Sequence, residues 1–529
     1  MKNRILFWGL FCSVFILSIF FSNSRGLAIE HISPPLANPE ARSIPNLWAW
    51  VLPEDEEINE EAEAGMMDQM MANYGNWDNW VREQMATNLQ SGNWDQALNQ
   101  LENTWELDLQ TFYGEKAPRR EVSLQQLQQT LAGLDQETGQ KSAIVYLASR
   151  PNSLEVLLVT AETPPARHSI AEAKRDVLFK TAGQLLLRID SRERTTGRAY
   201  LTPARQLYRW IINPLIPQLD RQQINNLIFV TDYGLRSIPM AVLHDGQQFL
   251  IEKYSIANSP SFSMINPRFR SLKESPVLAM GASTFINQEP LPAVPVELRM
   301  ITQERVRGQS FLNQPFTVNN LISQRQRQPF EIVHLATHAG FNDGSPDRSY
   351  IQFFDSQLLL NDLGKLGLND PPVSLLVISA CQSAIGNRNA ELGFGGLALK
   401  SGVDTVVASL WYVSDEGTLA LMSEFYRYLR TAPIKAQALR QAQIAMLKGN
   451  IRIENGQLVI QTDLGNDIAN NPNNNSINNL ANNSANNLTN NLANNQTSIA
   501  LPPELRNLNV QNLTHPYYWS SFVMLGSPW

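Results

Sequence analysis

Short runs of apolar, mostly β-branched residues alternate with helical patterns from about residue 140 onward. The runs read, in order, SAIVYLAS, LEVLLVT, NLIFVTD, PVLAMGAS, EIVHLATHAG, VSLLVISAC and DTVVASLW. One stretch between them, residues 171–188, has the apolar spacing of a helix. This alternation is typical of a parallel or mostly parallel sheet with helices on both faces. The pattern therefore predicts an α/β fold for most of the chain.

The same pattern places two reactive side chains near strand ends. His338 lies in the run EIVHLATHAG, and Cys381 ends the run VSLLVISAC about forty positions later. The carboxyl ends of parallel strands meet at one edge of a sheet, where open α/β sheets bind ligands. A thiol beside an imidazole is the minimal pair for a cysteine nucleophile, because the thiolate is the attacking species.

Cys381 has a second interpretation, since free cysteine is often buried and behaves as a small apolar residue. The residues QSAIG that follow it are polar and contain a glycine, unlike a core segment. This continuation and the distant histidine favour a nucleophile. His334 lies four residues before His338 and so on the same side of the strand. We expect His334 in the core or behind the reactive pair. Neither histidine has cysteine or acidic ligands at metal spacing, so no metal or cofactor is expected.

Residues 51–135 have a different pattern. They begin with an acidic stretch and carry apolar residues at helical spacing, such as Trp94, Leu98 and Leu101. This spacing predicts two or three helices. The segments GNWDNW and GNWDQAL recur about 17 residues apart, and the second resembles the opening of a tetratricopeptide helix. A plain helical cap and one degenerate tetratricopeptide-like unit both fit this region.

Three further segments lie outside the predicted core. Residues 1–28 place Lys2 and Arg4 before an apolar run, which predicts a signal peptide or a membrane anchor and therefore an extracytoplasmic protein, secreted, periplasmic or single-pass membrane-anchored. Residues 29–50 contain several prolines and read as a linker. Residues 466–498 are rich in asparagine and predict a disordered insertion, because folded-looking sequence resumes after them.

The composition narrows the classes of function. Of the 529 residues, 43% are hydrophobic and 17% are charged, as in an ordinary globular protein. The net charge of −7 gives no reason to expect nucleic-acid binding. The only other cysteine, Cys12, lies in the apolar amino-terminal segment, so a disulfide framework is not expected and Cys381 should be a free thiol.

Several ordered motifs resemble the CHAT domain, which is related to caspases, separases and gingipains. They are HLATHAGF, LLVISACQSAIG, GFGGLALKSGVDTVVASLWYVSDEGTLALMSEFYRYL, KAQALRQAQIAML and HPYYWSSFVMLG, preceded by GLRSIPMAVLHDGQQFLIEKYSI and LPAVPVEL. The resemblance covers about residues 140–529. It implies a caspase-like α/β fold, in which residues 140–325 lack the catalytic pair and residues 326–529 carry a histidine and cysteine dyad.

The resemblance also implies roles for individual residues. Cys381 would attack a peptide carbonyl, and His338 would manage protons and donate one to the leaving amine. Backbone amides of Cys381, Ala339 and Gly340 would hold the oxyanion. Ala339 stands between His338 and Gly340, where many relatives have glycine directly after the histidine.

Further candidates flank the dyad. Gln382 and Ser383 directly follow the nucleophile, where family members usually have an acidic residue and then Thr-Gly, so this loop is expected to differ in shape. Trp411 and Asp415 follow the run DTVVASLW. We expect these four residues to line a substrate groove, with a helix cap by Ser414 or Asp415 as the alternative.

Two functions from different classes follow. The first is a caspase-like cysteine endopeptidase, exported or membrane-tethered, which cleaves protein substrates and is controlled by a partner that binds the helical region. The second is a catalytically silent protein-interaction module with the same fold. A latent zymogen, blocked by the asparagine-rich loop or the helical region, is a third. Membrane contact is expected only through the amino-terminal segment.

Overall fold

A computed structural model describes most of the predicted α/β domain and part of the helical region. The described residues are 80–113, 122–190, 197–232, 234–340, 349–381, 399, 401–411, 413–461, 496–506 and 512–529. The chain divides into two compact units, Met1–Asn59 and Glu60–Trp529, and every described residue belongs to the second. The predicted leader or anchor (1–28) and the linker (29–50) therefore lie outside the described residues. Within the described ranges, no helix has both the length and the apolar character needed to cross a membrane.

A small group of helices precedes the sheet, as predicted. One helix ends at residue 91, and it is followed by α4 (Trp94–Tyr113) and α5 (Leu124–Thr138). The ends of α5 are encoded locally. Ser123 and Gln126 form a capping box at its start, and Gly139 ends it in the left-handed conformation with φ 69°.

Among the described residues, thirteen strands form one large sheet at the centre of the unit. Its path runs β10-β9-β8-β11-β12-β16-β5-β4-β1-β2-β3, and β6 pairs with β8 and β7 beside this path. The first half of the sheet consists of β1 (Ser142–Arg150), β2 (Ser153–Thr160), β3 (Ala166–Ile170), β4 (Asn226–Thr231) and β5 (Ser255–Ser259). The second half consists of β6 (Val277–Gly281), β7 (Gly308–Leu312), β8 (Ile332–Gly340), β9 (Tyr350–Gln352), β10 (Gln357–Leu359), β11 (Leu375–Cys381), β12 (Thr405–Ser409) and β16 (Phe522–Gly526).

The sheet is mostly parallel within each half. Strands β1, β4 and β5 are parallel in the first half, as are β7, β6, β8, β11 and β12 in the second. Residue 325, the predicted boundary between the halves, follows two strands of this parallel group in sequence. Strands β6 and β7, which precede it in sequence, hydrogen-bond to β8 and to each other, so they belong to the second half.

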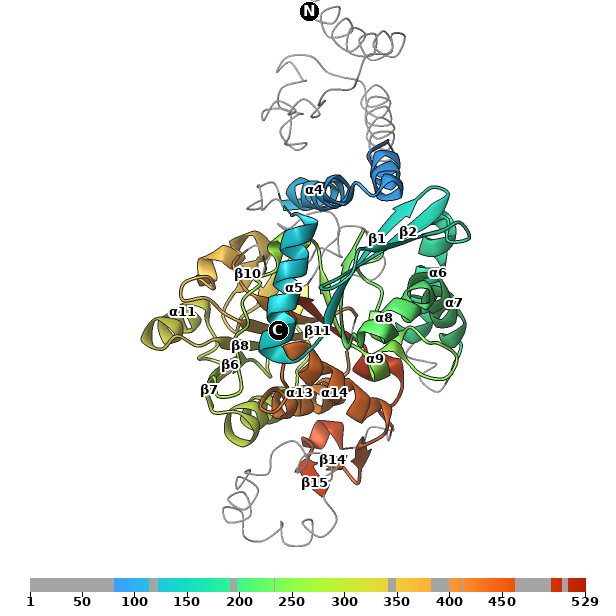
Figure 1. Ribbon diagram of the computed structural model, residues 1–529. Helices are drawn as coiled ribbons and strands as arrows, with labels where there is room; N and C mark the ends of the chain where they lie inside the picture. The colour runs from blue at the N-terminus through green and yellow to red at the C-terminus, as the bar shows by residue number, and fades with distance from the viewer. Residues whose placement is uncertain are drawn as a thin grey trace, which may run out of the picture. The chain divides into compact units, whose positions relative to one another are not determined.

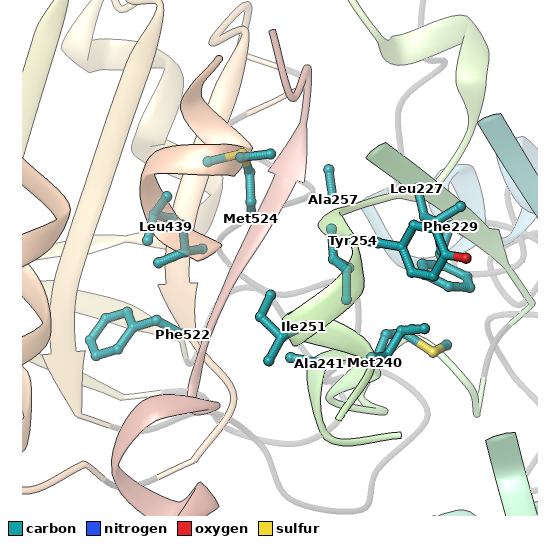
Figure 2. Close-up of a cluster of buried hydrophobic side chains, with 14 of the residues drawn as sticks. Leu227, Phe229, Met240, Ala241, Ile251, Tyr254, Ala257, Leu439, Phe522 and Met524 are labelled. Carbon is teal, nitrogen blue, oxygen red and sulfur yellow. The ribbon is translucent and has the colours of Figure 1, made fainter. Parts of the chain in front are cut away.

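The two halves run in opposite directions. Strand β16 is antiparallel to β12 and parallel to β5, so it reverses the strand direction where the halves meet. The carboxyl ends of the parallel strands in the two halves therefore lie at opposite edges of the continuous sheet. Figure 2 shows a cluster of apolar side chains at this junction, which includes Phe522 and Met524 of β16 together with Leu439, Ile251 and Ala257. All five are part of the largest hydrophobic core.

Helices cover both faces of the sheet, as the alternating pattern predicted. The helices of the first half are α6 (Arg175–Asp190), α7 (Leu201–Ile211), α8 (Ile216–Gln222) and α9 (Leu250–Lys253). Those of the second are α10 (Val294–Arg299), α11 (Val318–Arg327), α13 (Asp415–Leu429), α14 (Lys435–Leu447) and α17 (Pro516–Trp519). Figure 1 shows α6, α7 and α8 grouped beside the first half and α11 beside β6 and β7.

Strand alternation assigns residues of β8 and β11 to two separate cores. On β8, Ile332 and Ala336 belong to the larger core, whereas Val333 and Leu335 belong to the smaller one. Both faces of these strands are thus buried, which explains why their sequences are continuous apolar runs. The two histidines of β8, His334 and His338, share the face of Ile332 and Ala336 because successive side chains alternate.

A small antiparallel sheet flanks the asparagine-rich segment. It consists of β13 (Ile451–Glu454), β14 (Gln457–Gln461) and β15 (Gln496–Ala500). Most of the predicted insertion at 466–498 lies outside the described residues, but its last three residues begin β15. Strands β14 and β15 pair with each other, so the two ends of the segment between them are adjacent.

Candidate active site

The backbones of His338 and Cys381 lie opposite each other at the ends of two neighbouring strands. In the parallel ladder of β8 and β11, the last pair in register is Cys381 with His338. Neighbouring strands are about 4.8 Å apart, so the two residues are adjacent across the sheet. The side chain of Cys381, and all of Gln382 and Ser383, lie outside the described part of the chain.

The imidazole of His338 is held from two sides by the loop between β6 and α10. Its Nε2 lies 2.8 Å from the backbone carbonyl oxygen of Glu289. Its ring centroid lies 4.6 Å from that of Phe285, and the residue is 9% exposed. A carbonyl oxygen only accepts hydrogen bonds, so Nε2 carries the hydrogen in this arrangement. The nitrogen left to accept a proton is therefore Nδ1.

Neither partner of His338 was found from the sequence. The acceptor at Glu289 is a backbone carbonyl, which every residue carries, so no side-chain type marks it. Phe285 lies in the segment STFINQEPLP, whose apolar residues show no period. Position along the chain is the signal that could have found this loop. It directly follows β6, and β6 pairs with the strand that carries His338.

A buried polar network lies on the same face of the sheet, below His338. Glu297 of α10 accepts a hydrogen bond of 2.7 Å from Ser379 Oγ of β11. The same oxygen of Glu297, Oε1, lies 3.1 Å from His334 Nε2, close enough for an ion pair but without hydrogen-bond alignment. His334 Nδ1 lies 3.1 Å from the hydroxyl of Tyr426. His334 thus lies in the core behind the candidate dyad, one of the two positions expected for it.

Asp415 links the loop beside His338 to the start of α13. Its Oδ2 accepts a hydrogen bond of 3.3 Å from the amide of Ala293, directly before α10. Burial, with added repulsion from the carboxylates of Glu297 and Glu416, raises the pKa of Asp415 to about 7. The helix cap itself is Ser414, whose hydroxyl accepts from the amide of Gly417. Asp415 is therefore the first residue of the helix, and its carboxyl group faces the loop.

The expectation that Trp411 lines a substrate groove does not fit its position. The side chain is 1% exposed and belongs to the larger core. Its indole Nε1 donates a hydrogen bond of 3.1 Å to the backbone oxygen of Tyr517. An indole that is buried and donates its hydrogen bond inside the protein is part of the core and is not available to a substrate. The sequence placed Trp411 correctly at the end of β12 but could not show which side it faces.

Backbone groups near the candidate dyad are partly engaged. Ala339 and Gly340 pair with Ile351 and Tyr350 of β9. Consecutive residues of an antiparallel ladder alternate between bonded and non-bonded pairs, so the ladder engages only one of these two amides. A Cβ at Gly340 would lie 2.6 Å from the Tyr350 ring, so a larger residue here would displace that ring.

The carbonyl that precedes Cys381 is also fixed. Ser409 Oγ at the end of β12 donates a hydrogen bond of 2.8 Å to the backbone oxygen of Ala380. Among the described residues, no group of three or more His, Cys, Asp or Glu side chains is arranged to hold a metal ion.

The structure is that of an α/β protein whose mostly parallel sheet places a histidine and a cysteine at the ends of adjacent strands. A family model described as the CHAT domain matches residues 201–527, which is more than half of the chain. The chain therefore belongs to the CHAT domain family. No curated protein sequence matches it.

Two solved structures are similar to this one in part. Both are crystal structures of the separase–securin complex of Saccharomyces cerevisiae, determined at 3.0 and 2.6 Å. The first match has 11% identity and a TM-score of 0.37, and the second has 10% identity and a TM-score of 0.39. Each match covers 66% of this chain and 32% of the other chain, so the protein corresponds to about a third of those chains.

Proposed function

We propose that this protein is a cysteine endopeptidase in which Cys381 is the nucleophile and His338 is the general base and acid. The observation that carries the proposal is the register of β8 and β11, which pairs the two residues at the carboxyl ends of adjacent strands. Membership of the CHAT domain family adds support, because this family is related to peptidases that use such a dyad.

The hydrogen bond to Glu289 determines which ring nitrogen would act. With Nε2–H donated to the carbonyl oxygen, Nδ1 accepts the thiol proton of Cys381. The thiolate sulfur then forms a bond to the substrate carbonyl carbon, and backbone amides hold the oxyanion. As the carbon–nitrogen bond breaks, the proton on Nδ1 passes to the leaving amine. Water then hydrolyses the acyl-enzyme and restores the thiol.

The helical region is the proposed place for control by a partner. Its side chains reach into the first half of the sheet, where Arg82 pairs with Asp232. Glu102 of α4 accepts hydrogen bonds from the hydroxyl of Tyr146, 2.9 Å, and from the amide of Phe262, 3.1 Å. A protein bound to these helices would therefore act first on the first half of the sheet. The export or tethering signal of residues 1–28 belongs to the same proposal.

A cleavage assay on the full-length protein tests the dyad. We expect wild-type protein and a Cys12→Ser control to cleave members of a diverse peptide library, as detected by mass spectrometry. Cys381→Ala and His338→Ala should lose cleavage by at least about 1,000-fold, as expected when a nucleophile or its base is removed. Absence of any Cys381-dependent cleavage would contradict the peptidase and favour the catalytically silent interaction module.

A further inference from the structure

The carboxylate of Glu297 lies where three parts of the candidate site meet. It accepts the Ser379 hydroxyl at 2.7 Å and lies 3.1 Å from His334 Nε2. These two partners belong to β11 and β8, the strands that end at Cys381 and His338. Helix α10, which carries Glu297, follows directly on the loop whose Glu289 carbonyl holds His338. One side chain thus touches both candidate strands and belongs to the helix after the orienting loop.

The contact lies close behind the dyad position. Ser379 is two residues before Cys381, which is roughly 7 Å along a strand. It pairs in register with Ala336, midway between His334 and His338. The carboxylate therefore joins β11 one side-chain layer below Cys381 to β8 two layers below His338, and any change in the separation of the strands at this level is transmitted to the last register pair.

The chemistry of this position is unusual for a core. Glu297 is 2% exposed, His334 is 0% and Ser379 is 6%, although the neighbouring positions on this face of β8 are apolar. A buried carboxylate is costly to desolvate, and apolar residues of similar volume are often equally or more stabilising. Stability alone therefore gives little reason to keep an acid between these strands.

We infer that Glu297 is a positioning residue for the proposed dyad. Through Ser379 and His334 it fixes β11 against β8, and through α10 it fixes the loop that presents the Glu289 carbonyl. The inference rests on the proposed function, since it concerns how the imidazole and thiol are aligned. Misalignment acts on the chemical step, so loss of Glu297 reduces kcat and leaves KM nearly unchanged.

Two substitutions separate positioning from packing. Glu297→Leu keeps most of the side-chain volume and removes both polar contacts, whereas Glu297→Gln keeps an acceptor for Ser379 and a polar group for His334. We expect Glu297→Leu to lower kcat by about 10- to 100-fold and Glu297→Gln to restore most of it. Ser379→Ala removes one contact and should have an intermediate effect, which keeps the test decisive if the leucine variant does not fold.

A second readout does not require cleavage. The rate at which iodoacetamide alkylates Cys381, followed by peptide mass spectrometry from pH 5 to 9 on the full-length protein, reports the thiolate. We expect Glu297→Leu to lower this rate near neutral pH and to change its pH profile, and Glu297→Gln to return both towards wild type. Asp232→Asn is the matched control, because it removes a buried carboxylate from the strand ends of the first half.

The outcomes distinguish the inference from the proposed function. If wild type does not cleave peptides but Cys381 alkylation depends on Glu297, the positioning role stands and the peptidase does not. If wild type cleaves but Glu297→Leu retains kcat and alkylation rate, the inference is overturned. It is also overturned if Asp232→Asn lowers both quantities as much as Glu297→Leu at an equal loss of thermal stability.

Discussion

The neighbouring strands β1 and β4 of the first half end near Ser149 and Asp232, whereas β8 and β11 of the second half end near His338 and Cys381. In the first half, Asp232 accepts two hydrogen bonds from Arg82, 2.5 and 2.9 Å long, and two from Ser149. Arg82 and Asp232 have side chains only 3% and 0% exposed. The strand ends of the first half are thus closed by the protein's own arginine.

The strand ends of the second half have different surroundings. One ring nitrogen of His338 is hydrogen-bonded to a backbone carbonyl oxygen. Among the described contacts, no oppositely charged group pairs with this imidazole. The carboxylates nearby, Glu297 and Asp415, lie behind it and contact β8, β11 and the loop before α10. The comparison shows that the carboxyl ends of the parallel strands are closed by a buried ion pair in the first half, whereas in the second half they present an imidazole without such a pair.

Removing the guanidinium from the closed edge should have the largest effect on stability. Arg82→Ala leaves Asp232 buried without its charge partner, and we expect a loss of about 3 to 5 kcal/mol of unfolding free energy. Urea denaturation of the purified protein measures it. A loss below about 1 kcal/mol would show that the helical region does not seal the first half.

Replacing both partners is the control for that prediction. Arg82→Met combined with Asp232→Leu removes the pair without leaving an unpaired charge, so the double variant should be more stable than Arg82→Ala alone. A double variant as unstable as the single one would mean that packing, and not the charge, holds the helical region.

The two halves should also respond oppositely to pH. Burial alone would raise the pKa of Asp232, but the Arg82 charge and the Ser149 hydrogen bonds hold it below its ordinary value. The stability that this pair contributes is present above the ordinary pKa of 3.8 and is lost as the pH falls through the lower folded value. Lowering the pH should therefore destabilise the strand ends of the first half before those of the second half.

Asp415 behaves in the opposite sense. Its pKa is raised from 3.8 to about 7, chiefly by burial, so the folded protein holds its proton more tightly than the unfolded chain does between these values. Stability falls as the pH rises through that window and stays lower above it. Asp415→Asn should abolish this decline, so that its unfolding free energy at pH 8 relative to pH 4 exceeds that of wild type by on the order of 4 kcal/mol. Urea denaturation across this pH range checks it, and an unchanged slope would contradict the assignment.

The smallest effect is expected at the exposed rim of the first half. Arg150 pairs with Glu83, which is 51% exposed, and with Glu155, which is 1% exposed. Glu83→Gln should cost less than about 1 kcal/mol because solvent screens the pair. Glu155→Gln should cost more, since Glu155 also holds Arg167. Thermal denaturation measures the stability lost by each variant. An equal loss of stability in the two variants would mean that the exposed and the buried carboxylate contribute alike.

Much of the second half could be predicted from the sequence, because each strand is marked by its own contiguous apolar run. The apolar runs gave β8 and β11, and the strand ends placed His338 and Cys381 at one edge, as the register shows. The partners of these residues could not be predicted. Glu289 contributes a backbone oxygen, and Glu297 is an ordinary acidic residue in a short helix until the fold brings it between two strands.

The ion pair that closes the strand ends of the first half could not be predicted for a different reason. Arg82 and Asp232 are 150 positions apart, and nothing in either segment marks them as a pair. The pairing of β6 with β8 could not be predicted for the same reason, since it is a tertiary contact. Trp411 shows the third limit: a strand-end residue can face the core or a groove, and only packing decides which.

Covalent labelling can show directly whether Cys381 is a nucleophile activated by His338. The full-length protein is treated with a mixed library of peptidyl acyloxymethyl ketones, and the modified residue is located by mass spectrometry. We expect a single adduct at Cys381 that disappears in His338→Ala and persists in Asp232→Asn. Absence of the adduct from the folded wild-type protein, or an equal rate of labelling in His338→Ala, would contradict it.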